Sequence, residues 1–289
     1  MNYSHFQKVS WYPGHMHRAM RLITEKLKHI DIFLEVRDAR VPLSSFNKHV
    51  DNIIKATHKE KIVIFNKYDL CDKNKTDKVI EDLRSIGILS LAISAKERRY
   101  DFSKILKATR AIKKERYSSV GLWMMIGGVP NVGKSNIINN LRVQSKNFEH
   151  NQVAKSHSKV CLTTYTNGFK ISEDPLAYLI DTPGLLYPSI ESPQSGLSLG
   201  LIGSVKEKIV GKDVLCEFLY YSLGTKGMDI MFKKYNMTTR PTSHIDMVRR
   251  TAEAFKYNDD ELAQNRLLKD FREGVFGDIT LDDVYSKLD

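Results

Sequence analysis

The fold is decided by residues 128–135, Gly128-Val-Pro-Asn-Val-Gly133-Lys134-Ser135, which follow the apolar run 120–126. That run has the length and composition of a buried parallel strand. Glycines after such a strand let backbone N–H groups converge on phosphate oxygens, and the start of the next helix adds partial positive charge. The stretch therefore predicts a phosphate-binding loop, with Lys134 at the β- and γ-phosphates and the Ser135 hydroxyl on Mg²⁺. A chance match in a surface loop is the alternative.

The residues expected to read the base lie earlier in the chain, at Asn66-Lys67-Tyr68-Asp69. They follow the buried-strand pattern of residues 61–65, which places them at the carboxyl edge of a parallel sheet, where nucleotides bind in open α/β folds. The Asp69 carboxylate can accept hydrogen bonds from N1–H and the N2 amine of guanine, whereas adenine offers neither donor. The motif therefore predicts GTP rather than ATP. Taken alone, this tetrapeptide also fits a solvated turn.

A third loop strengthens this interpretation. Residues 88–93 form another strand pattern and lead into Ser94-Ala95-Lys96, a short loop whose backbone N–H groups can reach guanine O6. Two such loops after two successive strands are hard to obtain by accident. The predicted GTP-binding residues are Asn66, Lys67, Asp69, Ser94, Ala95, Lys96, Asn131, Val132, Gly133, Lys134, Ser135 and Gly184.

The Mg²⁺ side of the site is predicted at Asp181-Thr182-Pro183-Gly184, after the strand pattern of residues 176–180. Asp181 would hold Mg²⁺ directly or through water, and the Gly184 N–H would sense the γ-phosphate. Leu185 follows, where many signalling GTPases carry a glutamine that orients the attacking water. Because leucine cannot form a hydrogen bond, either another group positions this water or the site barely hydrolyses GTP unaided.

A threonine that closes over Mg²⁺ is expected between the phosphate loop and Asp181. Thr163 and Thr164 are the candidates, and Thr163 is favoured as the Mg²⁺ ligand. Both threonines also suit an ordinary strand, because β-branched side chains favour one.

The two base loops precede the phosphate loop, which reverses the usual order in a GTPase. One pocket must bind both ends of the nucleotide, so residues 1–189 are predicted to form a Ras-like α/β sheet with circularly permuted connectivity. From Pro193 the apolar spacing is helical, and residues 190–289 are predicted to form a small all-α domain. Its expected core stripes are Leu197, Leu201 and Val205, then Val214, Phe218, Tyr221 and Leu223, and then Leu262, Leu267, Leu268 and Phe271.

Positive charge is concentrated in the predicted nucleotide domain. The chain has 45 Lys and Arg against 34 Asp and Glu, a formal net charge of +11, and 31 and 18 of these lie in its first 189 residues. The densest stretch is residues 96–116, where a helix with Phe102, Ile105, Leu106, Thr109 and Ile112 inward would present Arg98, Arg99, Lys104, Lys107, Arg110, Lys113, Lys114 and Arg116. Such a face suits an RNA backbone, because neutralising phosphates releases counterions. An ordinary solvated helix face is the alternative.

Hydropathy and cysteine usage exclude two other classes. No apolar run approaches the length of a membrane span. Cys71, Cys161 and Cys216 are too scattered for a zinc site and are typical of reduced thiols.

Two further stretches complete a family resemblance: Trp11-Tyr-Pro-Gly-His15-Met16, and Asp38-Ala-Arg-Val-Pro-Leu-Ser44 between it and the base loops. With these motifs in this order, the chain resembles the circularly permuted ribosome-assembly GTPases, and most of all their mitochondrial members. The resemblance extends to Asp270-Phe-Arg-Glu-Gly-Val-Phe-Gly277. It implies a GTP-hydrolysing factor that acts on the large ribosomal subunit and its rRNA in the mitochondrial matrix, with GDP as product. It also implies that the helical domain of residues 190–289 contacts ribosomal RNA or protein. Peripheral contact with the inner membrane stays open.

The resemblance also implies roles for residues that the motifs alone do not assign. His15 becomes the candidate catalytic group that orients water, since an imidazole with a reference pKa of about 6.5 keeps a neutral fraction at physiological pH. A cap on the helix that begins near Met16 is the alternative role. Asn131 would help to hold K⁺ beside the phosphates, or would only stabilise its loop. The chain departs from the family at Val160-Cys161, where Pro-Gly usually precedes the threonine.

Two other functions fit part of the sequence. An RNA-binding scaffold that holds GTP with little turnover is compatible with Leu185 and with the altered threonine loop. A membrane-linked or tRNA-modifying GTPase would share the K⁺ chemistry, but those classes usually keep the unpermuted order.

Overall fold

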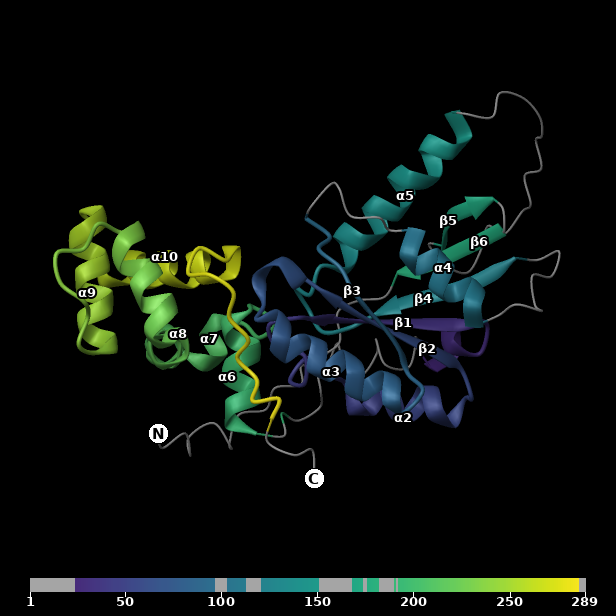
Figure 1. The fold of residues 1–289 in the computed structure, drawn as a ribbon, viewed down its shortest axis with the longest axis horizontal. Helices are drawn as coiled ribbons and strands as arrows, with labels where there is room; N and C mark the ends of the chain where they lie inside the picture. Colours follow the sequence, from purple (N-terminus) through teal and green to yellow (C-terminus); the bar gives the residue numbers. More distant parts are fainter. Residues whose placement is uncertain are drawn as a thin grey trace.

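The computed structural model describes residues 24–96, 103–112, 121–150, 168–173, 176–181, 190 and 192–285. A sheet flanked by helices forms one part of the molecule, and a group of helices forms the other (Figure 1). The described strands all lie before residue 182, and the helices of the second part follow them from residue 193 onward.

Within the described residues, the sheet has six strands in the order β3-β2-β1-β4-β6-β5. They are β1 (Ile32–Asp38), β2 (Glu60–Asn66), β3 (Leu89–Ala92), β4 (Leu122–Gly127), β5 (Gly168–Glu173) and β6 (Leu176–Asp181). All neighbours are parallel except β5, which is antiparallel to β6. The first strand, β1, lies in the middle, between β2 and β4. Three strands, β1 to β3, come before β4 and the phosphate loop that follows it, and the predicted permuted α/β sheet is confirmed.

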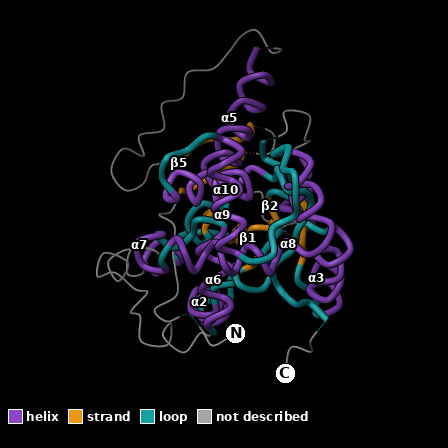
Figure 2. Tube along the Cα trace, turned by 90° about the vertical axis from the view of Figure 1, so that its left-hand side faces the viewer, coloured by secondary structure: helices purple, strands orange, loops and turns teal. Residues whose placement is uncertain are grey.

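Helices cover both faces of the sheet because buried side chains alternate along its strands. Val63 and Phe65 of β2 pack in one cluster with side chains of α3 (Lys73–Ser85), while Ile62 and Ile64 belong to the cluster on the opposite face. Accordingly, α5 (Lys134–His150) lies on one side of β1 and β2, and α2 (Lys48–Ala56) lies on the other (Figure 2). Among the residues that the structure describes, this part also contains α4 (Ser103–Ile112), the short η2 (Tyr68–Leu70) and a helical turn at residues 24–27.

The described part of the predicted basic helix has the expected orientation. In α4, Ile105 and Thr109 are buried, at 0% and 1% exposure. Lys104, Lys107 and Arg110 are exposed. The residues of this stretch that lie outside the described residues are Arg98, Arg99, Phe102, Lys113, Lys114 and Arg116.

The helical part begins where the sequence predicts. Helix α6 (Pro193–Leu201) has proline in its first turn, and the Ser192 hydroxyl caps it by accepting a hydrogen bond from the Ser195 N–H. It is followed by α7 (Glu207–Val210), α8 (Lys212–Lys234), α9 (His244–Phe255) and α10 (Asp260–Glu273). Helix α8 is kinked at Gly224, which has non-helical torsion angles.

Most members of the expected core stripes are buried and Val214 is half-buried, but two members are exposed. Tyr221 is 56% exposed and Leu262 is 49% exposed. Tyr221 lies about 200° around the helix from Leu223, and Leu262 lies about 140° from Leu267, at about 100° per residue. A single buried face cannot include both members of either pair, so these two predictions were wrong.

After α10 the chain returns to the sheet domain, as the yellow segment in Figure 1 shows. The Ile279 N–H donates to Leu70 O at 3.2 Å, and the Leu281 N–H donates to Arg40 O at 2.8 Å. The Asp282 carboxylate accepts from the Leu43 N–H at 2.7 Å and from the Ser44 N–H at 2.8 Å. The predicted division into residues 1–189 and 190–289 stays a prediction, and this returning segment joins the two parts.

Candidate functional site

The predicted base and phosphate loops meet at the carboxyl edge of the parallel strands, where Asn66 joins three of them. Its side-chain amide donates to Val132 O of the phosphate loop at 2.7 Å. Its side-chain oxygen accepts from the Ala95 N–H at 2.9 Å. Asn66 is 1% exposed, so both contacts are shielded from water. One buried amide thus sets the spacing between the loop for the base and the loop for the phosphates.

The phosphate loop needs glycine at its two ends for different steric reasons. Gly128 has a φ of +152°, and a Cβ there would lie 2.2 Å from Val36 O. Gly133 has a φ of +94°, and a Cβ there would lie 2.3 Å from the Asn66 amide nitrogen. The loop therefore curls tightly only because it carries no side chain at these positions.

We expect Gly133→Ala to weaken nucleotide binding by more than its backbone strain explains, because the new methyl group displaces the Asn66 amide. Strain at positive φ alone costs about 1–2 kcal/mol. The matched control is Gly87→Ala, since Gly87 has a φ of +81° with nothing within 4 Å of its Cβ position. Calorimetric titration with GDP and thermal melting of both variants measure the difference. Equal GDP affinity in the two variants would contradict this steric account.

Lys134 lies inside the phosphate loop with its ammonium group held by backbone carbonyls. It donates to Gly128 O at 3.2 Å and to Val129 O at 3.0 Å, and it is 8% exposed. Burial lowers the pKa of Lys134 to about 8, although the Asp181 carboxylate opposes this shift. A cation with so little solvation gains much from a phosphate group in the loop.

Ser135 and Asp181 provide oxygen donors beside Lys134. Ser135 is exposed in the first turn of α5, and Asp181 is exposed at the end of β6, opposite Ile126 in β4. A hydroxyl and a carboxylate next to a phosphate site are the donors that Mg²⁺ uses when substrate phosphates complete its shell. Among the described residues, no group of three His, Cys, Asp or Glu could hold a metal on its own. The donor set therefore fits a nucleotide-bound Mg²⁺ rather than a protein-caged ion.

The base loop is fixed by its own short helix. Lys67 adopts a left-handed conformation, with φ +62°, directly before η2. Its ammonium donates to Asn131 O of the phosphate loop at 2.7 Å. The Asp69 N–H donates to the Ser94 hydroxyl at 3.1 Å, which joins the base loop to the loop after β3. Lys96 is exposed at the end of that third loop.

Three predicted site residues lie outside the described residues, namely His15, Thr163 and Gly184. Their roles stay predictions.

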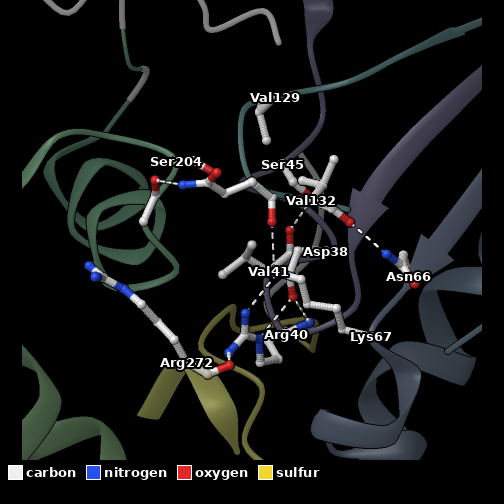
Figure 3. A network of polar contacts seen from close by, with 12 residues as sticks. Asp38, Arg40, Val41, Ser45, Asn66, Lys67, Val129, Val132, Ser204 and Arg272 are labelled. Carbon is white, nitrogen blue, oxygen red and sulfur yellow. Dashed lines mark hydrogen bonds and ion pairs between the residues drawn. The ribbon is translucent and has the colours of Figure 1, made fainter. Parts of the chain in front are cut away.

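The structure adds a polar cluster that the sequence reasoning did not assign. Asp38 is fully buried at the end of β1 and pairs with Lys67 at 2.8 Å and with Arg40 at 2.9 Å (Figure 3). Burial alone would raise the pKa of Asp38, but Arg40 and Lys67 together hold it well below its ordinary value. From the sequence, the stretch Asp38–Ser44 is only a motif of the family resemblance, with no role assigned to its residues. Its contact with the base loop has no signature in residue spacing.

Comparisons with known proteins agree with this geometry. The RsgA GTPase family model matches residues 44–191. Mitochondrial ribosome-associated GTPase 1 of Mus musculus is 28% identical over 295 residues, covering 94% of this chain and 89% of that protein. Ribosome biogenesis GTPase A of Bacillus cereus is 31% identical over 247 residues, covering 83% of this chain and 79% of that protein.

The fold is also that of a solved structure. GNP-bound YlqF from T. maritima superposes with a TM-score of 0.65 at 22% identity, covering 93% of this chain and 99% of that one. The family match therefore agrees with the reversed order of the loops and with their meeting at one edge of the sheet. The chain belongs to the RsgA GTPase family, with circularly permuted connectivity.

Proposed function

We propose that this GTPase is an assembly factor that acts on the large ribosomal subunit of mitochondria and couples GTP hydrolysis to subunit binding. The observation that carries the nucleotide part is the placement of Asn66, which joins the phosphate loop and both base loops. A ligand that spans these loops must present a base at one end and phosphates at the other. GTP is such a ligand, because Asp69 matches the two donors of guanine.

The residues of the phosphate side have distinct roles in this proposal. Lys134 binds the β- and γ-phosphates, and the loop N–H groups around Gly133 surround their oxygens. Ser135 and Asp181 would hold Mg²⁺, with Thr163 as the third protein ligand. When bound, Mg²⁺ supplies positive charge to the phosphate oxygens. His15 would orient the attacking water, because Leu185 cannot do so.

A K⁺ ion beside the phosphates is part of the proposal through Asn131. The amide nitrogen of Asn131 donates to Gly203 O. Because the NH₂ group of Asn131 donates to the helical part, the side-chain oxygen of Asn131 is left to accept. An amide oxygen suits a hard cation, which would add positive charge where other GTPases use an arginine.

The ribosomal part of the proposal rests on relatives and on charge. The mouse relative is named as ribosome-associated and mitochondrial, and the B. cereus relative is named for ribosome biogenesis. In this chain, exposed Lys104, Lys107 and Arg110 give α4 a basic surface that suits rRNA phosphates. No helix within the described residues is both long and apolar enough to cross a membrane.

We expect purified large ribosomal subunits to raise the GTP turnover of this chain, and to do so more in K⁺ than in Na⁺.

The triple variant with Lys104, Lys107 and Arg110 changed to alanine tests the basic surface of α4. In this variant, the slope of log binding constant for the subunit against log salt concentration should be shallower by about two to three. The matched control changes Lys226, Lys233 and Lys234, which are exposed in α8, and removes the same charge elsewhere. Turnover and subunit binding are measured on the same samples.

Two outcomes would contradict the proposal. Negligible turnover with and without subunits would instead favour a scaffold that holds GTP. Equal losses in the two triple variants would show that the surface of α4 contributes no more to association than the lysines of α8 do.

A further inference from the structure

Arg40 connects Asp38, which pairs with Lys67 of the base loop, to the C-terminal end of α10. Its guanidinium forms two bonds with the Asp38 carboxylate, at 3.0 Å and 2.9 Å. On its other side it donates to Phe271 O at 3.4 Å and to Arg272 O at 3.2 Å, in the last turn of α10. Arg40 is 1% exposed, so its charge depends on these partners.

From Asp38 the contacts continue to the phosphate loop. The second partner of Asp38 is Lys67, and Lys67 in turn donates to Asn131 O at 2.7 Å. Figure 3 shows Arg40, Asp38 and Lys67 side by side, with Asn66 and Val132 next to them. A shift at the end of α10 therefore reaches the backbone of the phosphate loop through the buried Arg40 and Asp38 and then through the partly exposed Lys67.

A second set of contacts runs from the same end of α10 to the same loop. Arg272 donates to Leu201 O at 2.9 Å and to Gly200 O at 3.1 Å, which holds the end of α6. The turn that follows α6 contacts the phosphate loop, because the Ser204 hydroxyl donates to Pro130 O and Gly203 O accepts from Asn131. The phosphate loop is thus held from two sides by elements that both depend on α10.

We propose that Arg40 is a positioning residue of the nucleotide site: it sets the place of Lys67 through Asp38 and takes its own place from the carbonyl end of α10. This inference rests on the proposed binding of guanine nucleotide by these loops. It follows that nucleotide binding and the seating of α10 stabilise each other, because coupling between two sites is reciprocal.

The chemistry of this place requires arginine. A planar guanidinium can bond a carboxylate with one edge and donate to two carbonyls with the other, whereas a lysine ammonium is a single point charge. Lysine at position 40 would keep the ion pair with Asp38 but could not also donate to both carbonyl oxygens at the end of α10. Packing between the two parts would persist, since Gly274 lies so close to Leu70 that a Cβ there would be 2.4 Å from the leucine side chain.

The test compares Arg40→Lys with wild-type protein in two measurements. The first is GDP affinity by calorimetry, where we expect a loss of about 5- to 150-fold, the usual range of coupling between sites. The second is amide hydrogen exchange at residues 271–275, where the N–H groups of Gly274 and Val275 close the end of α10. GDP should slow this exchange in the wild type and should slow it much less in Arg40→Lys.

Arg250→Lys is the matched control. Arg250 pairs with Asp246 at 2.7 Å within α9, so this substitution changes an arginine–aspartate pair that the nucleotide loops do not touch. It should bind GDP as the wild type does and keep the response of residues 271–275. A general effect of arginine replacement on stability would appear equally in both variants, and melting curves would report it.

The outcomes separate this inference from the proposed function. An Arg40→Lys variant that binds GDP with wild-type affinity, and whose α10 still responds, would overturn the inference alone. If Arg40→Lys does not fold, hydrogen exchange of the wild type still tests the inference. Unchanged exchange at residues 271–275 under saturating GDP would overturn the inference. A wild type that binds no guanine nucleotide would sink the proposed function and this inference with it.

Discussion

Asp69→Asn is expected to lower the affinity for GTP by about 10²- to 10⁴-fold, because each charge-assisted hydrogen bond contributes about 1.5–3 kcal/mol and two are lost or reversed. The physical reason is the donor pattern of the base. Guanine presents two hydrogen-bond donors to this position. The asparagine amide can accept from only one of them, because its NH₂ group is a donor and faces the other. Xanthine carries an oxygen at C2, so the same variant should bind xanthosine triphosphate better than wild-type protein does.

Asp72→Asn is the matched control for this experiment. It removes the same charge three residues away, and Asp72 caps α3 by accepting a hydrogen bond from the Asn74 N–H. Asparagine caps a helix about as well as aspartate, so this control should leave GTP affinity and stability unchanged. Competition titrations with GTP, ATP and xanthosine triphosphate give the result. Unchanged preference for GTP in Asp69→Asn would mean that the base does not lie at this loop.

Lys134→Ala should lower affinity for GTP and GDP by about 30- to 5,000-fold, since removing one partner of a buried charge pair costs about 2–5 kcal/mol. The charge of this lysine also makes binding depend on pH. In the free protein burial lowers the pKa of Lys134 to about 8, and phosphate groups beside the ammonium should raise it again. Above pH 8, binding must therefore take up a proton, and wild-type affinity should fall by up to about tenfold per pH unit.

Titrations between pH 7 and pH 10 on both proteins measure this dependence. The Lys134→Ala variant is the control for the wild type, because it has no amine to protonate at this position. Its affinity for nucleotide should change less between pH 7 and pH 10 than that of the wild type. Identical slopes for wild type and Lys134→Ala would show that another group titrates, and would contradict the assignment of Lys134 to the phosphates.

Sequence reasoning located the strands and loops better than the helical core. Four strand patterns were found close to their true bounds, because continuous apolar runs of this length are distinctive in a buried parallel sheet. Apolar spacing in the helical part was less reliable. It included Tyr221 and Leu262, which are exposed, since spacings of two and five residues do not stay on one helix face.

The sequence alone predicts the chemistry of the nucleotide loops. The roles predicted for Gly133, Lys134 and Asp69 depend on torsion angles, charge and donor pattern within a few residues, so a local sequence pattern is enough to predict them. The joining of these loops to the helical part depended on the folded structure. Arg40 meets Phe271 and Arg272 across more than 200 residues of sequence, and only the packing of α10 against the base loop brings their atoms within hydrogen-bonding distance.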